Sequence, residues 1–195
     1  MEDTKSSVLA PEYPGYGCFK KEIETLDPKR LKTKTRDILS MTKDIFYWAT
    51  KKSNGGLGFE ASDIFVWGRS IGTGPASYMA NDNPGVKGLI LVSPYTSLKK
   101  LASSKTRYLG GFGSWFIEDN SYENDKCMET ISCPVLIIHG EKDIVIPWQM
   151  SDELSKILRR RDKLHDFKHP YEMTHHLFDF SRDILNPAKQ FMSRL

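Results

Sequence analysis

The stretch IFVWGRSIGTGPA, residues 64–76, constrains the fold of this chain more than any other. The apolar run 63–68 is typical of a β-strand buried on both faces. The residues that follow, 70–81, predict a helix, because Pro75 falls near its first turn, where a missing N–H matters least. A serine flanked by glycines between a strand and a helix predicts a sharp turn that holds the serine hydroxyl above a sheet. A purely structural glycine turn is the alternative.

The local geometry of this turn leads to specific expectations. A side chain at Gly68 or Gly72 is expected to collide with the neighbouring element, and Ser70 is expected to have a strained backbone. The N–H of Ile71 then lies at the start of the helix, where it can stabilise a developing oxyanion. Ser70 is therefore the candidate nucleophile of an acyl-transfer reaction.

Strands and helices alternate along the rest of the chain. Apolar runs at 86–94 and 134–140 predict two further buried strands, and residues 164–171 predict a last one. Segment 6–13 is interpreted as a short first strand. Helices are expected from Asp27-Pro28 to Asn54-Gly55, over 147–161, and once or twice within 177–195. The alternation predicts an α/β fold, a mostly parallel sheet with helices on both faces, in one domain spanning 1–195.

A nucleophilic serine needs a base, and the base needs a carboxylate to orient it. Glu141 and Asp143 follow the strand predicted at 134–140, and His175 and His176 follow the last strand. This order, serine, acid, histidine, is the one expected when all three lie at strand ends. Glu141 is interpreted as a loop residue, and the alternative for Asp143 is a turn carboxylate. His139 ends an apolar strand and is expected to be buried and hydrogen-bonded rather than the base.

Composition limits the other classes of function. The 195 residues carry a formal net charge of only +3, which argues against nucleic-acid binding. The basic run at 159–163 is interpreted as a solvated helix end. No run of about 18 apolar residues and no signal peptide is found, so we expect a cytoplasmic location. The three cysteines, Cys18, Cys127 and Cys133, favour a reduced setting over a disulfide framework or a zinc site.

Several segments together resemble the α/β-hydrolase superfamily, namely PEYPGYG, GRSIGTGPA, SPYTSL, PVLIIHGEKDIVIP and THH. They are most similar to the branch of the α/β-hydrolase domain-containing 13 and 17 proteins, some of which remove palmitate from protein cysteines. The likeness covers roughly residues 8 to 185. It implies that Asp143 is the acid and that His175, rather than His176, is the base. It implies no metal and no organic cofactor.

Two departures from the family pattern lead to further expectations. Family members begin with additional strands, one of which ends in a His-Gly segment that supplies a second oxyanion N–H. Since this chain begins after that segment, we expect a weak esterase with a tendency to self-associate through unpaired strand edges. The cysteine-rich membrane-targeting terminus of the depalmitoylating members is also absent, so peripheral membrane attachment is expected only of a longer form.

The sequence thus predicts a serine hydrolase that cleaves an ester or thioester of a small-molecule or acyl-protein substrate. Segment 96–130 is expected to form a cap over the site, with an apolar acyl pocket built from Tyr108, Phe112, Trp115 and Phe116 or, alternatively, ordinary core packing. A hydrolase scaffold that acts only through protein contacts is the competing hypothesis.

Overall fold

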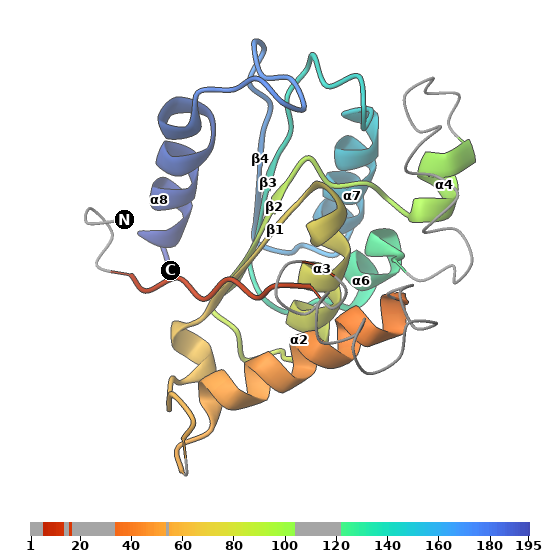
Figure 1. Cartoon of the computed structure of the whole chain (residues 1–195). Helices are drawn as coiled ribbons and strands as arrows, with labels where there is room; N and C mark the ends of the chain where they lie inside the picture. Colours follow the sequence, from red (N-terminus) through yellow and green to blue (C-terminus); the bar gives the residue numbers. More distant parts are fainter. Residues whose placement is uncertain (1–5, 14–15, 17–33, 54, 104–121) are drawn as a thin grey trace.

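Four parallel strands form the centre of the structure, which is a computed structural model describing residues 6–13, 16, 34–53, 55–103 and 122–195. The strands lie in the order β1-β2-β3-β4 (Figure 1). Their bounds are Phe65–Arg69 for β1, Gly88–Val92 for β2, Val135–Ile138 for β3 and His165–Lys168 for β4. Every neighbouring pair is parallel, which confirms the predicted sheet.

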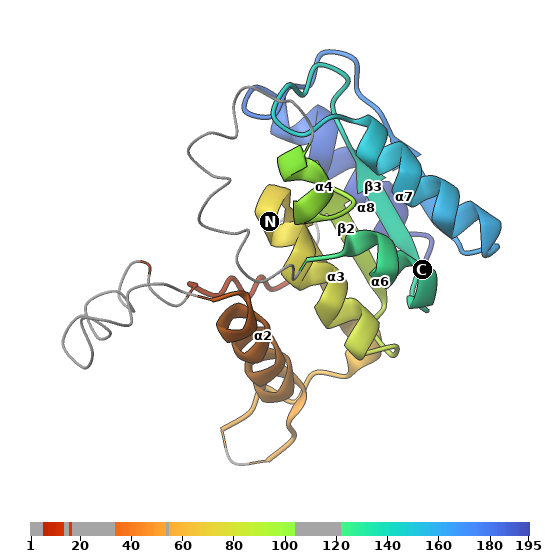
Figure 2. The ribbon, with the colours of Figure 1, turned by 90° about the vertical axis from the view of Figure 1, so that its right-hand side faces the viewer.

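Helices cover both faces of this sheet (Figures 1 and 2). The crossover helices α3 (Thr73–Asp82), α6 (Asn124–Thr130) and α7 (Gln149–Arg160) share one face, and α2 (Thr35–Thr50) packs outside α3. They share a face because successive right-handed crossovers that advance in one direction place their helices on the same side. The short helix α4 (Leu98–Ser103) precedes α6. On the other face lie a π-helical segment, Phe180–Leu185, and helix α8 (Asn186–Met192).

The central strands divide the core into two layers, since successive side chains of a strand point to opposite faces. Leu89 and Leu91 of β2 pack with the layer of α3, α6 and α7, whereas Ile90 and Val92 pack with α8. All residues of β2 and β3 are buried. Two covered faces explain why both strands have nearly continuous apolar sequences.

Strand β1 differs from its prediction. Its sequence predicts burial on both faces, but only Val66 and Gly68 are buried, and Trp67 keeps 43% of its surface exposed. Phe65 contacts Phe191 of α8, with ring centroids 6.4 Å apart. Helix α8 covers Phe65 but not Trp67, so the face of β1 that points toward α8 is exposed at Trp67.

The elements before β1 also differ from the prediction. Segment 6–13 is not a strand, since it joins no ladder of the sheet, and Val8 and Leu9 are 67% and 49% exposed. Pro11 within it lacks the N–H that a ladder needs. Helix α2 ends at Thr50, several residues before the predicted glycine stop, and Gly55 then adopts a φ of +85° in the following loop. The predicted helix start at Asp27-Pro28 lies outside the described residues.

Candidate active site

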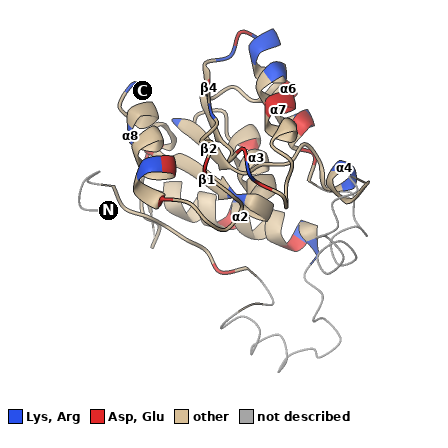
Figure 3. Cartoon of the chain, turned by 90° about the horizontal axis from the view of Figure 1, so that it is seen from above, with Lys and Arg blue, Asp and Glu red and all other residues tan. Residues whose placement is uncertain are grey.

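Ser70, Asp143 and His175 meet at the carboxyl ends of the strands, the side of the sheet that Figure 3 views from above. Ser70 follows β1, Asp143 lies in the loop after β3, and His175 lies in the loop after β4. The carboxyl ends of parallel strands share one edge, so residues far apart in sequence become neighbours there. Lys and Arg do not gather on one face in this view but are interspersed with Asp and Glu.

Ser70 has the strained backbone that the sequence predicts. Its φ is +52°, in the left-handed region that favours glycine. A Cβ at Gly68 would lie 2.5 Å from the carbonyl oxygen of Gly72 and 2.7 Å from the Cβ of Ala76, so only glycine fits where the strand meets the helix. The expectation for Gly72 is wrong, because among the described residues a Cβ there would contact only the Tyr13 hydroxyl, at 3.4 Å.

The three side chains form a continuous hydrogen-bonded chain. The hydroxyl of Ser70 lies 3.0 Å from Nε2 of His175, and Nδ1 of His175 lies 2.8 Å from Oδ2 of Asp143. Asp143 and His175 are both buried, whereas Ser70 is half-buried. Since the carboxylate accepts only, Nδ1 carries the proton and Nε2 is left to accept from the serine hydroxyl.

Asp143 is held as an anion from several directions. Its Oδ1 accepts the N–H groups of Val145 and Ile146, both at 2.9 Å, and its Oδ2 lies 3.3 Å from Nε2 of His139. Burial alone would raise the pKa of this carboxyl. The hydrogen bonds from His139, His175 and Ile146 outweigh burial and hold the pKa well below its usual value. Asp143 is therefore both a turn carboxylate and the partner of His175.

His139 is fully buried behind this acid and does not contact Ser70. Its Nδ1 lies 2.6 Å from the Ser151 hydroxyl and its Nε2 lies 2.9 Å from the carbonyl oxygen of Ile146. A proton on Nε2 satisfies the carbonyl of Ile146 and leaves Nδ1 to accept from Ser151. The expectation that His139 is a buried, hydrogen-bonded histidine is confirmed.

The other candidates lie outside the hydrogen-bonded chain. His176 is exposed, and its ring packs edge-on against that of His175 with centroids 4.9 Å apart. Glu141 is exposed, and its backbone N–H donates to the carbonyl of Pro170. Ile71 lies in the first turn after Ser70, where backbone N–H groups have no partner within the helix.

Two residues near the site were not singled out from the sequence. Arg69 donates from Nη2 to the carbonyl oxygen of His175, and its guanidinium lies 5.1 Å from the ring centroid of Phe178. Gly140 lets the loop that carries Asp143 approach the loop that carries His175, because a Cβ at Gly140 would lie 2.5 Å from the carbonyl carbon of Met173. Arg69 occupies a variable position of the GxSxG pattern, so the sequence does not single it out. Gly140 could have been singled out, because it is a glycine at the end of an apolar strand.

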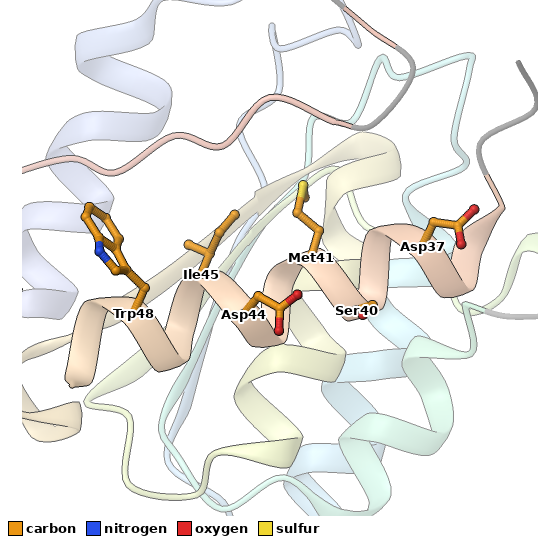
Figure 4. Close-up of a pocket in the computed structure, with 6 residues that line it drawn as sticks. All are labelled: Asp37, Ser40, Met41, Asp44, Ile45 and Trp48. Atoms are coloured by element: carbon orange, nitrogen blue, oxygen red, sulfur yellow. The ribbon is translucent and has the colours of Figure 1, made fainter. Parts of the chain in front are cut away.

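Part of the predicted cap lies outside the described residues, including Tyr108, Phe112, Trp115 and Phe116. A surface hollow that is described lies elsewhere, on one side of α2, and no residue of the hydrogen-bonded chain lines it (Figure 4). Its lining residues are Asp37, Ser40, Met41, Asp44, Ile45 and Trp48.

Other expectations concern metals, thiols and membranes. Among the described residues, no three His, Cys, Asp or Glu side chains are grouped to hold a metal ion. Cys127 and Cys133 are buried free thiols, and burial raises the pKa of Cys133 to about 11. Cys18 lies outside the described part of the chain. No helix in that part is long and apolar enough to cross a bilayer.

Comparisons with known proteins place this geometry in a wider context. No family model matches the chain. It is 32% identical over 140 residues to lysophosphatidylserine lipase ABHD12 of Macaca fascicularis, an alignment that covers 64% of this chain and 33% of that protein. The chain thus spans about a third of the length of the curated relatives it matches.

Solved structures share the fold at low sequence identity. Acetyl xylan esterase 1 from Thermoanaerobacterium sp. superposes with a TM-score of 0.60 at 18% identity, covering 88% of this chain and 56% of that one. Pyrococcus horikoshii acylaminoacyl peptidase superposes with a TM-score of 0.60 at 15% identity, covering 82% and 27%. The α/β-hydrolase fold is confirmed. The expected likeness to the 13 and 17 branch is wrong, because the sequence similarity is to ABHD12.

Proposed function

We propose that this chain, which has the α/β-hydrolase fold, is a serine hydrolase in which Ser70 is the nucleophile, His175 the base and Asp143 the acid. The observation that carries the proposal is the hydrogen-bonded chain from Ser70 through both nitrogens of His175 to Asp143, with contacts of 3.0 Å and 2.8 Å. It starts from a serine with a φ of +52°. Ser93 has a similar φ of +50°, so the hydrogen bond to His175, rather than the backbone strain, distinguishes Ser70.

The geometry supports a two-step acyl transfer. Ser70 Oγ attacks the carbonyl carbon of the substrate while its proton passes to Nε2 of His175. The anionic Asp143 stabilises the imidazolium that forms, and the Ile71 N–H donates to the oxyanion. As the intermediate collapses, Nε2–H gives its proton to the leaving group. A water molecule then attacks the acyl-enzyme by the same route, and Ser70 is regenerated.

For the substrate we infer a carboxylic ester with a single acyl chain. The support comes from relatives whose printed names are lysophosphatidylserine lipase and from an acetyl xylan esterase that shares the fold. A lysophospholipid is the first natural substrate to test. A thioester with the same acyl chain tests the broader expectation from the sequence, since both differ only in the leaving atom.

The test is covalent labelling with a fluorophosphonate probe, followed by hydrolysis of p-nitrophenyl butyrate. We expect labelling of the wild-type chain and none of the Ser70→Ala variant. Ser93→Ala is the matched control, because Ser93 is a buried serine that also follows a strand and has a φ of +50°. Labelling that persists in Ser70→Ala, or that is lost in Ser93→Ala alone, would overturn the assignment. A folded wild-type chain without labelling or turnover would favour the scaffold hypothesis.

A further inference from the structure

We infer that Arg69 is a positioning residue that fixes the location of His175 relative to Ser70, an inference that rests on the proposed function. Arg69 is the last residue of β1 and directly precedes the candidate nucleophile. Its side chain is exposed at a position that the nucleophile turn leaves variable. Among the described residues, its hydrogen bond to the carbonyl oxygen of His175 and its contact with the ring of Phe178 both fall on the loop that carries the candidate base.

The side chain reaches this loop because of the alternation of β1. Val66 belongs to the core layer beneath α3, so Arg69, three residues on, points to the opposite face, where Phe178 packs against the core layer of α8. A guanidinium suits such a site, since it is planar, stacks on an aromatic face and still donates hydrogen bonds. An ammonium group offers a point charge without the planar surface.

The loop that Arg69 contacts is closed by its own hydrogen bonds. Thr174 Oγ1 accepts the N–H groups of Leu177 and His176 at 2.8 Å and 3.3 Å, and the Thr174 N–H donates to the carbonyl of Leu177 at 2.9 Å. The turn 174–177 can therefore keep its shape and move as a unit. Among the described contacts, Arg69 supplies the hydrogen bond that reaches the main chain of this turn from another element.

Together these contacts close a small ring between the two segments. One path runs from the backbone of Ser70 through the Arg69 side chain to the carbonyl of His175. The other runs from the His175 ring back to the Ser70 hydroxyl, 3.0 Å away. The adjacent residues Arg69 and Ser70 thus contact the backbone and the ring of His175, respectively. A displacement of a reacting group by about 1 Å can lower the rate roughly a hundredfold. A contact that fixes the backbone of His175 should therefore affect catalysis.

The experiment compares Arg69→Gln, which is neutral and too short, with Arg69→Lys, which keeps the charge but not the planar fork. For p-nitrophenyl butyrate we expect kcat to fall by about ten- to a hundredfold in Arg69→Gln with KM changed less than about threefold. Arg69→Lys should recover part of the loss. Because Arg69 is exposed, the melting temperature should change little.

Arg194→Gln is the matched control. Arg194 is also exposed, donates to a backbone carbonyl, that of Gln190 at 3.2 Å, and lies 5.9 Å from a phenyl ring, that of Phe191. Arg194 also forms an ion pair with Asp166 of β4, and none of these contacts involves Ser70, Asp143 or His175. We expect its kcat and KM to match those of the wild type. An equal loss of kcat in Arg194→Gln would refute a specific role for Arg69.

A spectroscopic measurement separates failure of this inference from failure of the proposed function. The His175 Nδ1 proton that is donated to Asp143 should give a low-field proton resonance, absent in His175→Ala, whether or not the chain turns over an ester. We expect this resonance to weaken or disappear in Arg69→Gln and to return in Arg69→Lys. An unchanged resonance with a raised KM for anionic esters would show that Arg69 binds substrate instead, and would overturn the inference.

Discussion

Replacing Asp143 by asparagine tests the proposed acid most directly, because the structure dictates how the new amide must sit. Oδ1 accepts the N–H groups of Val145 and Ile146, each at 2.9 Å, whereas Oδ2 faces Nδ1 of His175 and Nε2 of His139. If the amide NH₂ took the place of Oδ1, it would face two backbone donors. The Ile146 N–H is buried and the Val145 N–H is partly buried, and leaving a buried N–H group without an acceptor costs about 1–3 kcal/mol.

The carbonyl oxygen of the new amide therefore keeps the Oδ1 position, and its NH₂ faces the two imidazoles. His139 tolerates this, since its Nε2–H also donates to the carbonyl of Ile146 at 2.9 Å. His175 must instead accept at Nδ1 and carry its proton on Nε2, where it can no longer take the proton of Ser70. In serine proteases this wrong tautomer lowers kcat by about 10⁴, or roughly 5 kcal/mol. We expect a loss of the same order here.

The assay is steady-state hydrolysis of p-nitrophenyl butyrate, with urea unfolding measured in parallel. Asp183→Asn is the control, because Asp183 is equally buried and accepts the N–H of Asp179 at 2.9 Å, outside the site. This control should lose stability but retain turnover within about threefold. If Asp143→Asn keeps more than about a tenth of the wild-type kcat, the orientation argument is refuted.

The remaining predictions address the base, the nucleophile turn, acid stability and the sheet edge. His175→Ala should lower kcat for ester hydrolysis by several orders of magnitude and His176→Ala by only a few-fold, and a reversed order would exchange their roles. Gly68→Ala should lower the free energy of unfolding by about 1–3 kcal/mol in urea titrations. Gly72→Ala should be nearly neutral, because in the described part of the chain its Cβ would meet only the Tyr13 hydroxyl. The lowered pKa of Asp143 stabilises the fold above the usual aspartate pKa of about 4, so stability should fall as the pH drops below about 4, and a flat profile there would contradict it. Since β1 pairs only with β2 in the described residues, we propose that the chain self-associates through the free edge of β1. The elution volume should depend on protein concentration, Trp67→Lys should abolish that dependence, and a dependence that persists in Trp67→Lys would refute association through β1.

Local sequence determines much of this structure because its signals act over a few residues. The apolar runs that become β2 and β3 are buried on both faces, as their near-continuous hydrophobicity predicts. The strained turn at Ser70 also follows from local chemistry, since Gly68 permits a backbone approach that any side chain would block. The order of serine, acid and histidine at strand ends narrowed the candidates to Ser70, Glu141 or Asp143, and His175 or His176. The family resemblance then favoured Asp143 and His175.

Other properties depend on contacts between distant segments, and only the tertiary structure decides them. Trp67 lies in an apolar run but stays 43% exposed, because helix α8 does not cover it. Helix α8 is more than a hundred residues away in sequence, so the run itself cannot show this. The family resemblance favoured His175 over the adjacent His176. Only the approach of the loop after β3 to the loop after β4, however, brings Nδ1 of His175 within 2.8 Å of Oδ2 of Asp143. Arg69 gives no local signal at all, since its two contacts lie about a hundred residues further along the chain. Burial, pairing and tethering are properties of two segments at once, and a pattern within one segment cannot specify them.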